Sequence, residues 1–164
     1  MAENQETKQL NRPDVIWTWR HFELFTAREW HAILKLRAEV FVVEQQCPYS
    51  DPDHKDPLCW HLVGLVDGDV VATLRAVPPG VSYTDSALGR VVIDPRVRGL
   101  ALGRELMERG MAFNRAMWGG AIRISAQAHL EAFYHSLGFA TQGKPYLEDD
   151  IPHIEMRLAA VTAE

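Results

Sequence analysis

The segment with the most evident chemistry is a turn of small and basic residues between an apolar strand and a helix. An apolar run ending at Ile93 leads into residues 96–104, which read RVRGLALGR. A helix N-terminus offers unpaired N–H groups and a partial positive charge, and small residues let an anion approach the backbone. Arginine adds charge-assisted hydrogen bonds to phosphate. The segment predicts either a phosphate or pyrophosphate site or a plain turn, made by Arg98, Gly99, Leu100, Ala101, Leu102, Gly103 and Arg104.

Other phosphate and metal sites do not fit the sequence. The chain has neither G-x-x-x-x-G-K-[ST] nor G-x-G-x-x-G, the patterns of the two common nucleotide-binding loops. A calcium loop of the EF-hand type starting at Asp51 would need Gly at its sixth position and Glu at its twelfth, where the chain has Asp56 and Leu62. The two cysteines and His61 fit no standard zinc spacing. We therefore expect no metal site.

Local signals indicate the elements that must position the turn. Thr26 and Glu29 form a T-x-x-E capping box, Asp67-Gly68 between apolar runs predicts a hairpin, and Gly119 ends the helix that follows the turn. Helices are expected after Thr26, from Leu102 and around Leu130, and a second short helical piece is expected over residues 41–45. The expected strands are 14–20, 61–66, 70–77, 88–94, 121–126, 139–141 and 153–158, and the expected loops are 46–59 and 143–152.

This order of elements predicts an α/β (α+β) fold with three layers, α/β/α, around a mixed and mostly antiparallel sheet. A helix crosses between strands 88–94 and 121–126, so these two strands should be parallel. A length of 164 residues suits one domain, expected over residues 13–164 after a disordered lead-in over residues 1–12.

Composition narrows the class of partner and the location. The formal net charge is -5 and the basic residues are scattered, which argues against nucleic-acid binding. No apolar run approaches the ~20 residues of a membrane span, and the polar N-terminus lacks the apolar core of a signal peptide. We therefore expect a cytoplasmic protein that binds neither nucleic acid nor membrane, and we leave a homodimer open as its assembly.

Two motifs resemble the signatures of the GNAT N-acetyltransferases. Arg96-x-x-Gly99-x-Ala101 matches R/Q-x-x-G-x-G/A, and residues 126–139, AQAHLEAFYHSLGF, resemble the second GNAT signature. Residues 36–45 (LRAEVFVVEQ) and 148–156 (EDDIPHIEM) resemble the ElaA branch of that superfamily. The resemblance covers roughly residues 14–159. It implies a GNAT-type sheet in which the parallel pair splays apart and leaves a slot for acetyl-CoA.

The resemblance also implies where acetyl-CoA lies. Backbone groups of Val91, Val92 and Ile93 would pair with the pantetheine arm, and a bulge there would direct an N–H at the thioester carbonyl. The turn at 98–104 would hold the pyrophosphate. Many relatives have an asparagine after the fifth strand that bonds the pantetheine or the amine; here Gln127 takes that role, or the role is absent.

Three side chains are candidates for proton transfer. Tyr134 falls on the tyrosine that protonates the leaving thiolate in many relatives, although it could instead be a packing residue. Glu44 is a candidate general base or a solvated carboxylate, and His153 has a suitable intrinsic pKa but lies at the start of a strand. Many relatives deprotonate the amine through a water chain, so a dedicated base is not required.

The implied activity is transfer of an acetyl group from acetyl-CoA to an unidentified primary amine, on a small molecule or a peptide. The alternative is a CoA-binding regulatory or interaction module without turnover. Arg75 and Arg90 are expected to pair with nearby acids, with an acidic acceptor as the alternative. Two acidic loops should either rim the acceptor entrance and favour a cationic amine or simply be solvated; their acids are Asp51, Asp53, Asp56, Glu148, Asp149 and Asp150.

Overall fold

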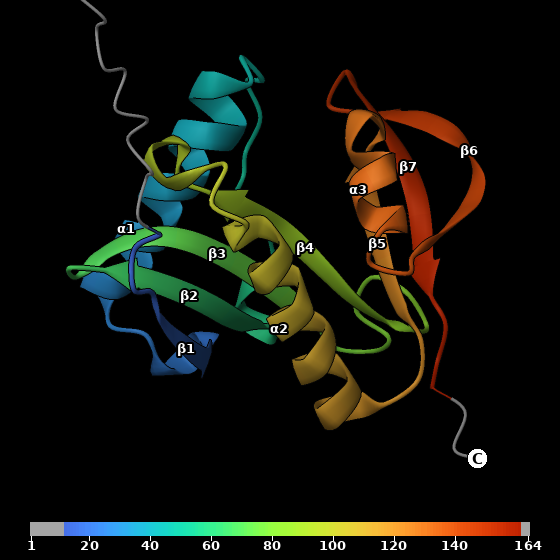
Figure 1. The fold of residues 1–164 in the computed structure, drawn as a ribbon, viewed down its shortest axis with the longest axis horizontal. Coiled ribbons are helices and arrows are strands. Elements are labelled where there is room, and N and C mark those ends of the chain that lie inside the picture. Colours follow the sequence, from blue (N-terminus) through green and yellow to red (C-terminus); the bar gives the residue numbers. More distant parts are fainter. Residues whose placement is uncertain (1–11, 162–164) are drawn as a thin grey trace, which may run out of the picture.

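The computed structural model describes residues 12–161, and a single mixed sheet runs through it (Figure 1). The 7-stranded sheet has the order β1-β2-β3-β4-β5-β7-β6, in which only β4 and β5 are parallel neighbours. Apart from Arg12, the predicted lead-in lies outside the described residues. The strands are β1 Ile16–His21, β2 Trp60–Val66, β3 Asp69–Val77, β4 Ser86–Ile93, β5 Ile122–Gln127, β6 Ala140–Glu148 and β7 Ile151–Leu158; the α-helices are α1 Ala27–Arg37, α2 Leu102–Trp118 and α3 Glu131–His135.

Helices cover both faces of the sheet, which confirms the three-layer fold. On one face α2 buries Leu106 in the main core together with Leu74 of β3, and α3 contributes Tyr134 to the same core. On the other face α1 packs Leu36 against Val92 of β4. None of the helices within residues 12–161 is long and apolar enough to cross a membrane.

Local sequence signals explain where several elements begin and end. The Thr26–Glu29 capping box is present in both directions and starts α1. The chain then continues as a π-helix, η2, over Ala38–Glu44, so the predicted second helical piece begins earlier than expected. The β2–β3 turn places both Asp67 and Gly68 at positive φ, as a type I′ hairpin requires. Gly119 caps α2 at φ +60.

The prediction of an acidic loop over 143–152 was wrong, because most of this segment is strand. β6 runs to Glu148 and β7 starts at Ile151, with only Asp149 and Asp150 as the turn, both at positive φ. β6 is an edge strand, and nearly all its residues are exposed on both faces. Its polar composition therefore reflects solvation and not the absence of a strand.

The parallel pair separates after a short contact, as the GNAT resemblance implied. Only Ser86↔Ile122 and Ala87↔Arg123 are in register between β4 and β5. Beyond them the strands diverge, so that β4 remains with β1–β3 and β5 remains with β7 and β6 (Figure 1). The helix α2 connects the two parts and lies against β3 and β4.

Close contact between α2 and the sheet generates a first prediction. A Cβ atom at Gly110 would lie 2.8 Å from Leu74 Cδ1 and 3.2 Å from Leu88 Cδ1. Gly110→Ala should lower the free energy of unfolding by about 1 kcal/mol, because overpacking costs about 1–3 kcal/mol against a helix-propensity gain of up to about 1 kcal/mol. Urea denaturation measures this difference.

The matched control is Gly103→Ala, in the first turn of the same helix. Its Cβ would meet nothing nearer than Ile93 Cγ1 at 4.0 Å, so stability should stay level or rise. If both alanine variants gained equally, close packing at Gly110 would not limit how α2 sits on the sheet.

Candidate active site

A cleft of about 1050 Å³ occupies the region where β4 and β5 diverge. It is lined by β4, the start of α2, the segment from η2 to Lys55, α3 and the β6–β7 hairpin. Among the site residues predicted from sequence, Leu100 alone does not line it. The structure brings together Glu44, Val91, Val92, Ile93, Arg98, Gly99, Ala101, Leu102, Gly103, Arg104, Gln127, Tyr134 and His153.

One end of the cleft is the start of α2, which no side chain caps. Ala101 occupies the N-cap position at φ +60, a left-handed conformation, and its methyl group cannot accept a hydrogen bond from the first-turn N–H groups. Gly99, at φ +78, has no atom within 4 Å of where a Cβ would lie. The first turn of α2 thus lines the cleft without a side-chain cap, which is the arrangement that binds phosphate groups.

Two arginines flank this helix start, and both are already engaged. Arg98 donates from Nε to the Ile93 carbonyl at 3.1 Å and from Nη1 to Glu44 Oε1 at 2.8 Å. Arg104 donates to Ser136 Oγ at 2.6 Å. Both arginine side chains remain about half exposed. Both side chains can therefore turn toward an anion bound at the start of α2 at modest cost. Glu44 is already paired with one of them, Arg98.

The wall formed by β4 contains a bulge. Thr73 is opposite Val92 and Arg75 is opposite Gly89, so Arg90 and Val91 together face the single residue Leu74 of β3. Arg90 has φ +50, a left-handed conformation that is uncommon for a residue other than glycine. Neither Arg90 nor Val91 has a registered partner on β3 or β5. Backbone groups here are available to a ligand in the slot.

Tyr134 enters the cleft from α3. Its ring packs edge-on against Phe133 and Phe139, with centroids 5.1 and 6.1 Å away, and only 7% of the residue is exposed. Its hydroxyl has no hydrogen-bond partner among the described residues. Burial raises the pKa of Tyr134 to about 12, so the phenol keeps its proton at neutral pH. Tyr134 is therefore present as a neutral phenol, which is the form that a proton donor must have.

His153 of β7 and Gln127 of β5 line the side of the cleft that faces β4. The Nδ1 of His153 lies 2.7 Å from the Ile151 carbonyl, which assigns a proton to Nδ1 and leaves Nε2 as the unprotonated nitrogen of the neutral ring. Gln127 donates to Oε1 of Gln45 at 3.1 Å. Gln45 is the residue that follows η2, on the other side of the cleft. The amide of Gln127 thus bridges the two walls.

Residues 67–160 match the family described as "Acetyltransferase (GNAT) domain". This chain belongs to that family. It is 34% identical over 152 residues to the protein ElaA of Escherichia coli, a match that covers 91% of this chain and 99% of ElaA. It is 37% identical over 145 residues to a UPF0039 protein of Synechocystis, covering 87% and 94% of the two chains. The family and the ElaA-like branch inferred from sequence are confirmed.

Solved structures agree with this assignment. An acyl-CoA N-acyltransferase from Pseudomonas aeruginosa superposes with a TM-score of 0.85 and is 43% identical, covering 89% of this chain and 100% of that one. The crystal structure of Escherichia coli ElaA gives a TM-score of 0.83 at 33% identity, covering 88% and 99%. The predicted mixed sheet with a parallel pair is thus the fold of GNAT-family acyltransferases.

The GNAT protein uses its first acidic loop in a way that the sequence did not indicate. Asp51 and Asp56 are each only 3% exposed, so they do not rim an open entrance. They pair with Arg37, which is fully buried, and Arg75 and Arg90 complete the cluster, as predicted for these two arginines. We call this set the arginine–aspartate network; it consists of Arg37, Arg75, Arg90, Asp51, Asp53 and Asp56.

Two alternatives were expected for this loop, acids that rim the acceptor entrance or acids that are simply solvated, and Asp51 and Asp56 fit neither. Three arginines neutralise its three aspartates. Sequence reasoning missed Arg37, because no local signal distinguishes it from a solvated arginine at the end of α1, and its partners lie 14 and 19 residues away. Glu148 and Asp149, by contrast, do line the cleft from the β6–β7 hairpin.

The arginine–aspartate network predicts how the free energy of unfolding changes as the pH falls. Burial alone would raise the pKa of Asp53, but Arg75, a backbone N–H and Arg90 lower it to about 2. An unfolded aspartate has a pKa of about 3.9, so the unfolded chain binds more protons between these values. Stability from Asp53 is therefore fully present above about pH 4 and is lost as the pH falls toward 2.

Urea denaturation between pH 2 and 6 tests this expectation. Asp53→Asn should flatten the fall in unfolding free energy between pH 4 and 2, and Asp67→Asn in the exposed β2–β3 turn serves as the control. An unchanged slope in Asp53→Asn would mean that the ion pair with Arg75 does not hold in solution.

Proposed function

We propose that this GNAT protein is an N-acetyltransferase that moves the acetyl group of acetyl-CoA directly onto a primary amine. The observation that carries the proposal is the cleft itself. It joins an uncapped helix start, suited to phosphates, to the hydroxyl of a largely buried tyrosine, which lacks a partner among the described residues. The edge of β4 that β5 leaves unpaired lies between the start of α2 and Tyr134.

Each part of acetyl-CoA has a matching part of the cleft. The pyrophosphate fits the N–H groups after Gly99 and the side chains of Arg98 and Arg104. The pantetheine amides fit the backbone edge of β4 at Val91 and Ile93, which β5 has left unpaired. The bulge offers an N–H to the thioester carbonyl, where negative charge develops as the amine attacks.

Proton transfers complete the reaction. The amine nitrogen forms a bond to the thioester carbon, and the carbon–sulfur bond then breaks. Tyr134 gives its proton to the departing sulfur. The attacking nitrogen loses its proton to His153 Nε2 or to water; of the two base candidates we favour His153, because Glu44 is paired with Arg98. Glu148 and Asp149 would attract the protonated form of the amine, which releases one proton to solvent before it attacks and the second, to His153 Nε2 or water, after the carbon–nitrogen bond forms.

The proposed phosphate site at the start of α2 is tested by the stabilisation that bound CoA gives to the protein. Saturation with CoA at 100 times its Kd should stabilise the wild type by about 2.7 kcal/mol. Gly103→Glu should abolish the shift, since the new carboxylate occupies the phosphate position while a first-turn glutamate remains compatible with the helix. Differential scanning calorimetry with and without CoA measures the shift.

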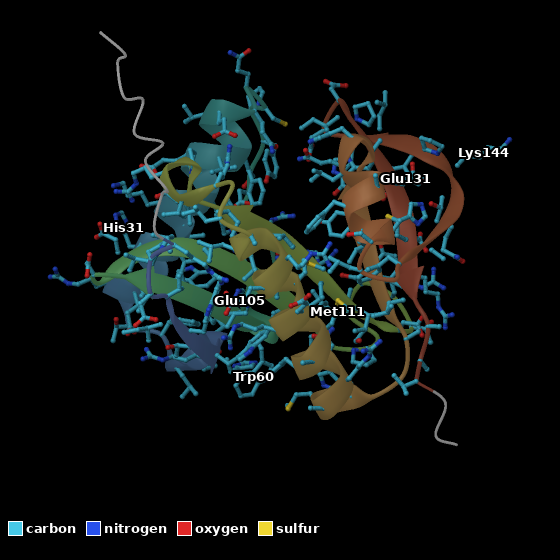
Figure 2. All side chains as sticks on the ribbon, in the orientation of Figure 1. His31, Trp60, Glu105, Met111, Glu131 and Lys144 are labelled. Carbon is cyan, nitrogen blue, oxygen red and sulfur yellow. The ribbon has the colours of Figure 1, made fainter. Side chains whose placement is uncertain are left out.

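Lys144→Glu is the charge control, because Lys144 projects from β6 away from the rest of the molecule (Figure 2). It makes the net charge more negative than Gly103→Glu does. A lost shift in both variants would indicate general repulsion of CoA, and a normal shift in Gly103→Glu would place the phosphates elsewhere.

Tyr134→Phe tests the proton donor. The variant should keep its affinity for acetyl-CoA and lose about 10²–10⁴-fold in kcat, as expected for removal of a general acid. The release of free CoA thiol from acetyl-CoA, in the presence of an amine panel, is the measurement. Because burial raises the pKa of Tyr134 to about 12, the wild-type rate should not fall through loss of this proton below pH 10.

Two results would contradict this role. A kcat equal to that of the wild type across the pH range would remove Tyr134 from the chemistry. Tight CoA binding without thiol release for any amine, in the wild type, would instead favour the regulatory module without turnover.

A further inference from the structure

The bulge in β4 is built on a residue that does not favour its own backbone conformation. Arg90 has φ +50, and a left-handed conformation is uncommon for arginine because its Cβ crowds the backbone. Such a conformation persists only where surrounding contacts fix it. The side chain of Arg90 supplies such contacts.

Within residues 12–161, the hydrogen bonds and ion pairs of the Arg90 guanidinium are all with the segment 49–53. Its Nε lies 2.8 Å from Asp51 Oδ1. Its Nη2 donates to the Asp51 carbonyl at 3.1 Å and to Asp53 Oδ2 at 3.4 Å. The guanidinium carbon also lies 5.8 Å from the centre of the Tyr49 ring. The bulge is thus anchored at its side chain and not by strand pairing.

The segment that anchors Arg90 is itself held on two sides. Arg37 of α1 donates from Nε to Asp51 Oδ2 at 2.7 Å, and the Tyr49 hydroxyl donates to Asp51 Oδ1 at 2.9 Å. Arg75 of β3 donates to Asp53 Oδ1 at 2.6 Å. Because α1 and β3 are rigid elements, the anchor cannot shift without breaking buried ion pairs, and such breakage is costly.

We propose that Arg90 is a positioning residue for acetyl transfer, and that Asp51 and Asp53 hold it so that the bulge keeps an N–H aimed at the thioester carbonyl. The inference rests on the proposed function. Arg90 acts here through the backbone that it fixes, and not by contact with the acetyl group. The arginine–aspartate network thereby connects α1, β3 and the loop between them to the polarising donor.

Arg90→Gly removes the side chain that anchors the bulge but still permits the positive φ of residue 90. Glycine adopts positive φ without strain, so the bulge remains allowed, but the anchor is gone. Arg90→Lys keeps the charge and can reach one carboxylate, although it cannot reproduce the several guanidinium bonds. Asp67→Gly is the matched control, because Asp67 has the same φ of +50 in an exposed turn and makes no hydrogen bond or ion pair with the network among the described residues.

Three readouts are needed on each purified protein. The first is the Kd for acetyl-CoA by calorimetry, and the second is kcat from thiol release. The third is the infrared carbonyl stretch of bound acetyl-CoA carrying ¹³C at the thioester carbon, which falls in frequency as the carbonyl accepts a stronger hydrogen bond. A residue with a merely structural role would not change that frequency in protein that remains folded.

For Arg90→Gly we expect a Kd near that of the wild type, a kcat lower on the order of 10²-fold, and a carbonyl stretch displaced toward the value for free acetyl-CoA. For Arg90→Lys, kcat and the carbonyl stretch should lie between the values for the wild type and for Arg90→Gly. Asp67→Gly should match the wild type in all three measurements. A wild-type stretch in Arg90→Gly, or a loss of acetyl-CoA binding in both Arg90 variants, would overturn the proposal. If Arg90→Gly does not fold, the stretch in Arg90→Lys decides alone.

Failure of the proposed function would look different. A wild type that binds acetyl-CoA with the carbonyl stretch of the free thioester would show that no donor is present for Arg90 to position. A wild type with a shifted stretch but no change in either variant would leave acetyl transfer intact and reject only the anchor.

Discussion

The divergence of β4 from β5 is the constraint on which the rest of the structure depends. Backbone N–H and C=O groups inside a sheet normally find partners on both sides, and unpaired buried groups are costly. Here the two strands remain in register only at Ser86↔Ile122 and Ala87↔Arg123, so an unpaired edge faces the interior of the fold. A bound ligand with its own amides relieves this deficit, and the uncapped start of α2 lies at the end of the same edge.

Holding such an edge open requires a rigid wall, and the arginine–aspartate network provides it on the β4 side. Buried ions lose hydration, so a network of this kind stabilises a fold only when its charges are balanced and its hydrogen bonds are made. Arg37 meets both conditions, because it donates to Asp51 and to both oxygens of Asp56. The Nε of Arg75, by contrast, is buried without a hydrogen-bond partner among the described residues, so the network as a whole fixes geometry more than it adds stability.

The parts that sequence predicts well are those with local causes. The capping box at Thr26, the Asp67-Gly68 hairpin and the small-residue turn before α2 each depend on a few adjacent residues, and each lies where it was expected. The bulge at Arg90 had only a family motif to suggest it, since its cause is a contact with a loop some forty residues away. Arg37 was missed for the same reason: a buried charge is readable only once its distant partners are known.

The polar strand β6 has a further consequence for the whole sheet. It is the outer strand, and an outer strand exposes N–H and C=O groups that can recruit a strand from another molecule. β6 carries Lys144 and Pro145 next to a shift in register between Gln142 and Tyr146, and proline cannot donate a hydrogen bond. The features that make this segment resemble a loop in sequence are thus the ones that discourage the sheet from growing into an aggregate.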